Sequence, residues 1–263
     1  IGGRHPIKIL VRILWDAYHR YGINLAHIEG GSLRNAIPRE ASAIFLVSRG
    51  YKENFVARFN IMAHEIKTEL SISEPGLKIE MSSAEMPPYV ISEAASEKII
   101  NTLYGCPHGV ISMSYRMPGL VETSTNLASV KIKDNRIIEI TTSQRSDQES
   151  GKQDIMSMVE SVFLLSGASV IHSEGYPGWT PNPGSGILKI TKETYIRLFG
   201  KQPIVRSIHA GLECGLFLSK YPGLDMVSFG PTLRDVHSPD ERINIETMGK
   251  FWKLLIGVLE NIP

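Results

Sequence analysis

The sequence lacks the features that mark several classes of protein. Two cysteines among 263 residues, Cys106 and Cys214, are too few for a disulfide framework and form no CxxC pair. The 28 Lys and Arg residues nearly balance the 27 Asp and Glu residues, and no basic tract is present that would bind nucleic acid. No apolar run approaches the ~20 residues of a membrane helix, and the N-terminus lacks a signal-peptide layout. We therefore expect a cytoplasmic protein that binds neither nucleic acid nor membranes.

An initiating methionine is also missing. The chain starts at Ile1, and a strong helical pattern follows almost at once. We therefore expect a fragment or processed segment of a longer protein. Its length and its 42% hydrophobic content suffice for one large domain or two of ordinary size.

The first part of the chain has the periodicity of helices packed on a sheet. From the N-terminus the pattern predicts a helix between Pro6 and Gly22, strand-like runs at Leu25–Glu29 and Ala36–Val47, a helix with an apolar face from Phe55 to Leu70, and a strand at residues 76–81. A similar order follows: a helix closed by Gly105, a hairpin turning at Asp134 and Asn135, a helix around residues 155–163, and a strand at 168–173. Two α-β-β-α-β units imply a pair of sandwiches with helices on one face of an antiparallel sheet.

A second part begins after "GYPGWTPNPGSG" (residues 175–186), whose three prolines and four glycines mark a domain boundary. The pattern then predicts a helix at 188–199, a strand at 204–209, a short helix, a strand at 225–230 and a helix at Ile245–Leu259. This alternation is typical of an α/β domain with parallel strands. Two strands are too few for a sheet of their own, so we expect part of a larger α/β domain.

His237, in "GPTLRDVHSPDERI", is a candidate zinc ligand because it follows a predicted buried strand, and active-site crevices of α/β sheets open at strand ends. The alternative is a helix start, with Ser238 as N-cap and Glu241 three residues later.

The stretch "SIHAGLECGLF" (residues 207–217) has several interpretations. His209 and Glu213 would share one face of a helix and could bind a metal. Cys214 with His209 could form a nucleophile and base, although the apolar setting disfavours a thiolate. The structural alternative is a turn whose glycines allow close approach of the backbone.

Two polar residues at predicted strand ends could bind an anion. Asn35, in "GGSLRNAIPRE", and Arg145, in "TTSQRSDQES", offer an amide and a guanidinium that suit a carboxylate. The alternatives are a solvated hairpin turn and a surface arginine.

Five segments together closely resemble the aminoacyl-histidine dipeptidases, of the M20 class of dinuclear zinc peptidases. They are "GGSLRNAIPRE", "GLVETSTNLA", "GYPGW", "IHAGLECGLF" with the following "KYPGLDMVSFGPT", and "HSPDE". The resemblance implies an α/β catalytic domain interrupted by a double-sized lid. Residues 1–173 would be the lid, which serves dimerisation and clamps the substrate, and residues 174–263 would be the C-terminal segment of the catalytic domain.

The resemblance also implies site roles. His237 matches a zinc ligand, while Asn35, Arg145 and the backbone N–H of Gly211 match groups that hold the substrate's C-terminal carboxylate. His209 and Glu213 would support this site. The family's other metal ligands and its catalytic glutamate lie in an N-terminal half that has no counterpart here.

We therefore expect part of a homodimeric dipeptidase that uses two zinc ions per intact subunit and hydrolyses dipeptides, including Xaa-His. The part represented by this chain is expected to be inactive alone, with no catalytic residue of its own. The alternative from another class is a non-catalytic module for lid formation, dimerisation or binding.

Overall fold

A computed structural model describes most of the chain. The described residues are 5–115, 118–134, 137–173, 175, 177–179, 182, 184–206, 213–236 and 240–263. They divide into two compact units. Unit 1 comprises Ile1–Met113, Glu122–Arg145 and Ser150–Ser173, and unit 2 comprises Ser114–Val121, Ser146–Glu149 and Glu174–Pro263.

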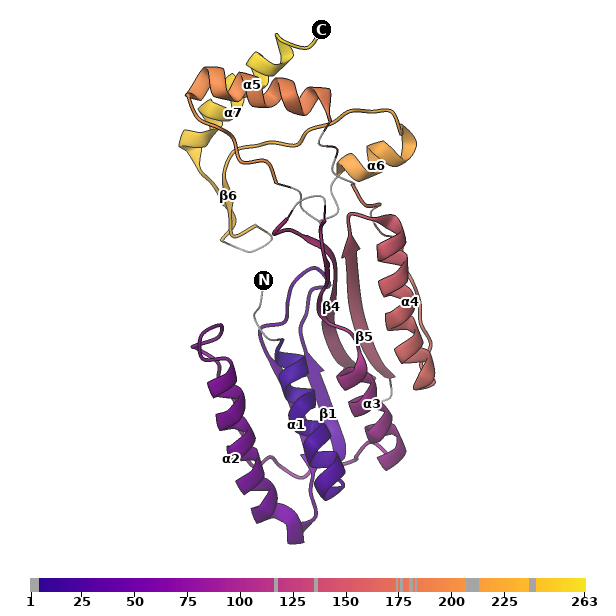
Figure 1. The fold of residues 1–263 in the computed structure, drawn as a ribbon. Coiled ribbons are helices and arrows are strands. Elements are labelled where there is room, and N and C mark those ends of the chain that lie inside the picture. Colours follow the sequence, from indigo (N-terminus) through magenta and orange to yellow (C-terminus); the bar gives the residue numbers. More distant parts are fainter. Residues whose placement is uncertain are drawn as a thin grey trace. The chain divides into compact units, whose positions relative to one another are not determined.

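Unit 1 is a layer of helices on an antiparallel sheet (Figure 1). The strands are β1 (Asn24–Gly30), β2 (Ala41–Leu46), β3 (Gly109–Met113), β4 (Val121–Lys133) and β5 (Ile137–Ser146). Their order is β2-β1-β4-β3, and β5 also pairs with β4. The two predicted repeats therefore contribute to one continuous five-stranded sheet, joined where Gly30 of β1 pairs with Val130 of β4. The predicted α/β class, with helices on antiparallel strands, is confirmed.

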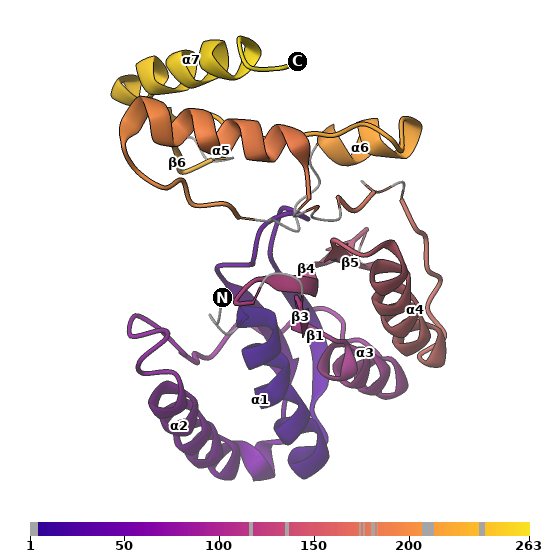
Figure 2. The same ribbon diagram turned by 45° about the horizontal axis from the view of Figure 1, so that its top comes forward.

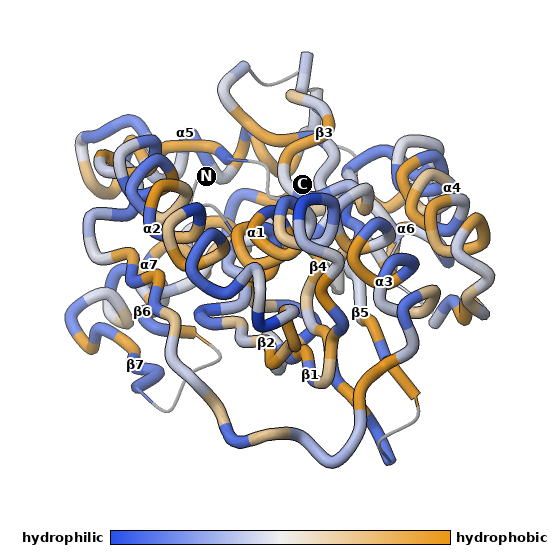
Figure 3. The backbone as a smooth tube through the Cα atoms, turned by 90° about the horizontal axis from the view of Figure 1, so that it is seen from below, coloured by the Kyte–Doolittle hydropathy of each residue, from blue (hydrophilic) through white to orange (hydrophobic). Residues whose placement is uncertain are grey.

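Four helices belong to this unit: α1 (Pro6–Tyr21), α2 (Lys52–Glu69), α3 (Glu93–Gly105) and α4 (Glu149–Leu165). Helix α1 lies between α2 and α3 on one side of the strands (Figures 1 and 3). It begins at a proline and ends at Gly22, whose left-handed φ of 62° lets its N–H bond the Tyr18 carbonyl. Its fully buried Ile7, Val11 and Leu14 anchor one core that also includes residues of α2, α3, α4, β1 and β4.

Some predicted strands of this part are not strands in the structure. Residues 76–81 and 168–173 form no ladder, and the second predicted strand begins at Ala41, not at Ala36. Leu77 and Ile79 still pack on the core while Lys78 and Glu80 point to solvent. Alternating burial therefore produced the pattern of a strand where no neighbouring strand supplies hydrogen bonds. Strand β3 is an addition that the sequence did not predict.

Unit 2 contains helices α5 (Gly186–Phe199), α6 (Glu213–Lys220) and α7 (Ile245–Leu259), with a short antiparallel pair, β6 (Leu233–Arg234) and β7 (Arg242–Ile243). Helices α5 and α7 lie side by side (Figure 2). They approach closely at Gly257, where an added Cβ would lie 2.9 Å from Thr194 Cγ2. Ser185 caps α5 by accepting a hydrogen bond from Leu188 N–H at 3.0 Å.

The three helices of unit 2 are those that the sequence predicts, but its strands differ. Residues 225–230, and residues 204–206 of the other predicted strand, are not in a ladder, whereas the β6–β7 pair was not predicted. An apolar run becomes a strand only where another strand meets it, and no described residue does so here. Within the described part of the chain, no helix combines the length and the apolar character needed to cross a membrane.

Candidate functional site

The β1–β2 loop, residues 31–40, carries the candidate Asn35. Where the chain leaves β1 for this loop, two consecutive positions, Gly30 and Gly31, have no room for a side chain. Gly31 has a φ of +70°, and a Cβ on it would lie 2.1 Å from the backbone oxygen of Ala128 in β4. A Cβ on Gly30 would lie 2.7 Å from Ile7 Cγ1 of α1. The loop therefore leaves the sheet pressed against β4 because its first residues have no side chains.

We expect Gly31→Ala to lower the free energy of unfolding of unit 1 by about 2–3 kcal/mol, since a left-handed alanine is strained and its methyl group meets backbone. Urea unfolding followed by the fluorescence of Trp15, with the other two tryptophans replaced by phenylalanine, measures this. Gly50→Ala is the matched control, because a Cβ there meets no atom within 4 Å. Equal unfolding midpoints for the two variants would contradict the prediction.

A side chain from β4 holds the loop at its centre. The Asn126 amide nitrogen donates a hydrogen bond to the Ala36 carbonyl oxygen at 2.9 Å. Ala36 N–H in turn bonds the Leu33 carbonyl at 3.2 Å, closing a turn that contains Asn35. The Asn35 side chain is exposed. The loop thus presents a free amide from a backbone that is fixed to the sheet.

Arg145 is the penultimate residue of β5 and is half-buried. No described residue pairs with its guanidinium. The preceding Gln144 donates from Nε2 to Thr125 Oγ1 at 3.1 Å, and Thr125 is the neighbour of Asn126 along β4. The structure therefore ties the chain segments of Arg145 and Asn35 to two consecutive positions of the same strand. These bonds hold the chain segments and not the Asn35 and Arg145 side chains, and consecutive side chains of a strand point to opposite faces of the sheet. A carboxylate site shared by the two residues therefore stays a prediction.

The other two predicted site residues, Gly211 and His237, lie outside the described residues, as does His209. The flanks of His237 are described. They are β6 and β7, paired as Leu233 with Ile243 and as Arg234 with Arg242. The alternative of a helix starting at Ser238 also falls on residues outside the description. Of the residues that follow, Arg242–Ile243 form β7, and the next described helix is α7, which begins after its cap, Asn244.

The described residues do not form a metal site by themselves. No group of three or more histidine, cysteine, aspartate or glutamate side chains in the described part of the chain is arranged to hold a metal ion. Structural and catalytic zinc sites take three or four protein ligands. The predicted zinc binding through His237 therefore stays a prediction.

A buried polar cluster in unit 1 was not predicted from the sequence. His5 is 1% exposed, and its ring lies 4.2 Å from the ring of His108. Lys8 Nζ donates to the carbonyl oxygens of Leu103, Tyr104 and Cys106, and so caps the C-terminus of α3. Both histidines stand next to prolines, His5 before Pro6 and His108 after Pro107. The neighbouring prolines restrict the local backbone, but they do not indicate that the two rings lie against each other.

Burial sets the protonation states in this cluster. Burial, with the charges of His108 and Lys8, lowers the pKa of His5 to about 3, although contacts with the Leu127 backbone and the Asn126 side chain act in the opposite direction. Burial and Lys8 lower the pKa of His108 to about 4. Burial also raises the pKa of the Cys106 thiol to about 11, which makes it a poor nucleophile at neutral pH.

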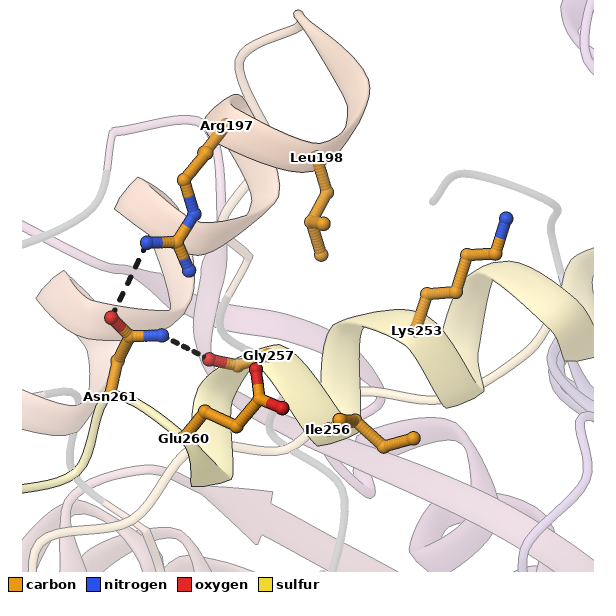
Figure 4. A pocket seen from close by; sticks show the side chains of 7 residues that line it. All are labelled: Arg197, Leu198, Lys253, Ile256, Gly257, Glu260 and Asn261. Atoms are coloured by element: carbon orange, nitrogen blue, oxygen red, sulfur yellow. Dashed lines mark hydrogen bonds between the residues drawn. The ribbon is translucent and has the colours of Figure 1, made fainter.

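An open groove of about 560 Å³ lies between the C-terminal parts of α5 and α7 in unit 2 (Figure 4). Arg197 Nη1 donates to Asn261 Oδ1 at 3.3 Å, and Asn261 Nδ2 donates to the Gly257 carbonyl at 2.6 Å. These bonds join the two helices. The groove contains none of the predicted site residues, so we assign it a structural role.

Comparison with known proteins identifies relatives of the whole chain. Residues 2–73 match a family model described as a peptidase dimerisation domain. The chain is 40% identical over all 263 residues to the cytosol non-specific dipeptidase of Escherichia coli strain K12, of which it spans 54%. A crystal structure of the aminoacylhistidine dipeptidase from Vibrio alginolyticus matches the full chain with a TM-score of 0.88 and 37% identity, and the chain covers 54% of it. The chain thus spans about half the length of the relatives that it matches.

Proposed function

We propose that this chain, which is related over its whole length to the M20 dipeptidases, is the lid and C-terminal catalytic segment of a metal-dependent dipeptidase. The observation that carries the proposal is the unbroken match of all 263 residues, in sequence to one dipeptidase and in fold to another. In this proposal residues 1–173 form the lid and residues 174–263 belong to the catalytic domain.

The proposed role of the lid is to hold the free C-terminus of a dipeptide. The Arg145 guanidinium would pair with the carboxylate, and the Asn35 amide and the Gly211 N–H would complete its hydrogen bonds. The fixed backbones around Asn35 and Arg145 support this role, because a clamp contributes to rate only when its groups are already in place.

Zinc is the proposed metal, with His237 as the one ligand from this chain. Bound zinc would polarise the scissile carbonyl and activate a water molecule. We propose that the remaining ligands and the general base belong to the part of the relatives that this chain does not match. The position of His237 between two paired strands suits a ligand, since the hairpin fixes both ends of its loop.

A carboxylate clamp predicts strong discrimination against blocked substrates. The test uses a fused protein in which this chain replaces the matched part of the E. coli dipeptidase. We expect a C-terminally amidated dipeptide to have a kcat/KM at least tenfold lower than the free dipeptide, since the charged partner of Arg145 is lost. Equal rates for both substrates would contradict the clamp.

A second candidate function, a module for dimerisation alone, is favoured by the family model over residues 2–73. These residues include β2, which ends the sheet and pairs with β1 on one side. Such an edge can pair with a second copy across a two-fold axis. We propose a homodimer in either case, because dimerisation through the lid is compatible with catalysis.

A further inference from the structure

The histidine pair, His5 and His108, is built in a way that only the uncharged rings satisfy. His108 Nδ1 lies 3.3 Å from the Leu127 N–H. A backbone N–H can only donate, so Nδ1 must carry a lone pair and the proton of the neutral ring must be on Nε2. Protonation of Nδ1 would set two N–H donors against each other and break this bond to β4.

His5 has no carboxylate partner among the described residues that could balance a charge on its ring. Neither of its ring nitrogens has a hydrogen-bond partner among the residues that the structure describes, and it makes no side-chain capping bond to α1 although it is the residue before that helix. Its contacts with the Leu127 backbone and the Asn126 side chain favour the charged ring, but they do not outweigh burial and the charges of His108 and Lys8. A buried imidazolium without a partner is strongly unfavourable.

The charged and polar groups around the pair also favour the neutral form of both rings. Lys8 of α1 acts on both rings, and the two rings act on each other, all as like charges when protonated. Cys106, before β3, acts on Lys8 and stays a neutral thiol at physiological pH. Strand β4 contributes only the uncharged Asn126 and Leu127. No carboxylate among the described residues acts on either ring.

The pair also touches the strand position that fixes the β1–β2 loop. Leu127 bonds His108, and the adjacent Asn126 bonds Ala36 in the turn that carries Asn35. The side-chain oxygen of Asn126, Oδ1, is buried and has no hydrogen-bond partner in the described part of the chain, so the bond from its amide nitrogen to Ala36 is the one that holds this side chain. Movement of β4 at residues 126–127 would therefore reach the loop.

We propose that the histidine pair is an acid-sensitive contact of the lid: while both rings are neutral it fixes residues 126–127 of β4 and, through Asn126, the β1–β2 loop, and protonation of either ring releases both. The effect on substrate binding rests on the proposed function of Asn35. The effect on the loop does not.

The direction of the pH dependence follows from the lowered pKa values of both histidines, about 3 and about 4. The folded unit keeps both rings neutral, whereas the unfolded chain takes up protons once the pH falls below the ordinary histidine pKa of about 6.5. The contribution of the two neutral histidines to the free energy of unfolding is thus fully present above about pH 6.5 and is lost as the pH falls toward 4 and 3.

The first measurement is the pH dependence of unfolding of the 263-residue chain between pH 7 and 4, followed by Trp15 fluorescence. His108→Asn keeps an acceptor near the position of Nδ1, and His5→Phe keeps a ring while removing two unpartnered nitrogens. We expect each variant to reduce the proton uptake on unfolding near pH 5 by about one proton, and the double variant by about two. His64→Gln removes an exposed imidazole from α2 and should retain the wild-type dependence.

The second measurement is hydrogen exchange of residues 31–40, corrected for the intrinsic effect of pH. In the wild type the protection of this loop should fall with pH, and in His108→Asn it should not. The proposal would be overturned if the stability of both histidine variants depended on pH as in the wild type. It would also be overturned if hydrogen-exchange protection of the loop stayed constant with pH while unit 1 lost stability. Neither readout uses a dipeptide, so a zinc-loaded fused protein that fails to cleave dipeptides would overturn the proposed function and leave this inference standing.

Discussion

Replacing Arg145 with alanine in the fused protein is expected to lower kcat/KM for free dipeptides by one to two orders of magnitude. A charge-assisted hydrogen bond to a carboxylate contributes about 1.5–3 kcal/mol, and 1.4 kcal/mol corresponds to a factor of ten. The residue is suited to this role because it is half-buried at the end of β5 and no described residue neutralises it. Steady-state kinetics at subsaturating dipeptide measure the effect.

Two controls separate the clamp from other roles. Arg145→Lys should recover only part of the rate, because lysine offers a point charge without the planar fork of donors. The zinc content of both Arg145 variants should equal that of the unmodified fused protein, since Arg145 is proposed to bind the substrate and not the metal. Unchanged dipeptide kinetics in Arg145→Ala, or a loss of zinc, would instead favour a solvated surface arginine.

The second large effect concerns zinc. We expect the 263-residue chain to bind zinc weakly and to cleave no dipeptide, because its described residues hold no group of three ligands and His237 alone cannot make a site. The fused protein should bind zinc tightly. Its His237→Ala variant should lose zinc, whereas its Arg145→Ala variant should keep it. Equilibrium dialysis followed by metal analysis gives both numbers. Stoichiometric tight zinc on the 263-residue chain would mean that the ligand set is wrong.

Helices were the part of the fold that the sequence could predict, because their signals are local. Pro6 and Gly22 bound α1, and Asn244 with a continuous apolar stripe gives α7 at residues 245–259. The pairing of β4 and β5 is local in the same sense, since only three residues of the sequence separate the two strands.

Strands depend on partners that the sequence does not reveal. Residues 76–81 alternate like a strand yet pack on the core without a ladder. Residues 225–230 carry the apolar Met226, Val227 and Phe229 but meet no described strand. Conversely, β3 was missed because its five residues carry little alternation of their own and are defined by their neighbour β4. Register and pairing are tertiary properties.

The candidate site shows the same division. Asn35 and Arg145 could be selected by residue type and by position at strand ends. Nothing in the sequence indicates that Asn126 bonds the loop that carries Asn35, or that Thr125 bonds Gln144, the residue before Arg145. The contact between His5 and His108 joins residues about a hundred positions apart. Such a contact exists only once α1 has packed against α3, since His5 directly precedes α1 and His108 lies between α3 and β3.

If this chain supplies the lid and part of the catalytic domain of a dipeptidase, the fused protein should hydrolyse a free dipeptide in a zinc-dependent reaction. We expect turnover that disappears when zinc is removed, returns when zinc is added back, and is lost in His237→Ala. A fused protein that is folded and loaded with zinc but releases no amino acids from dipeptides would contradict it.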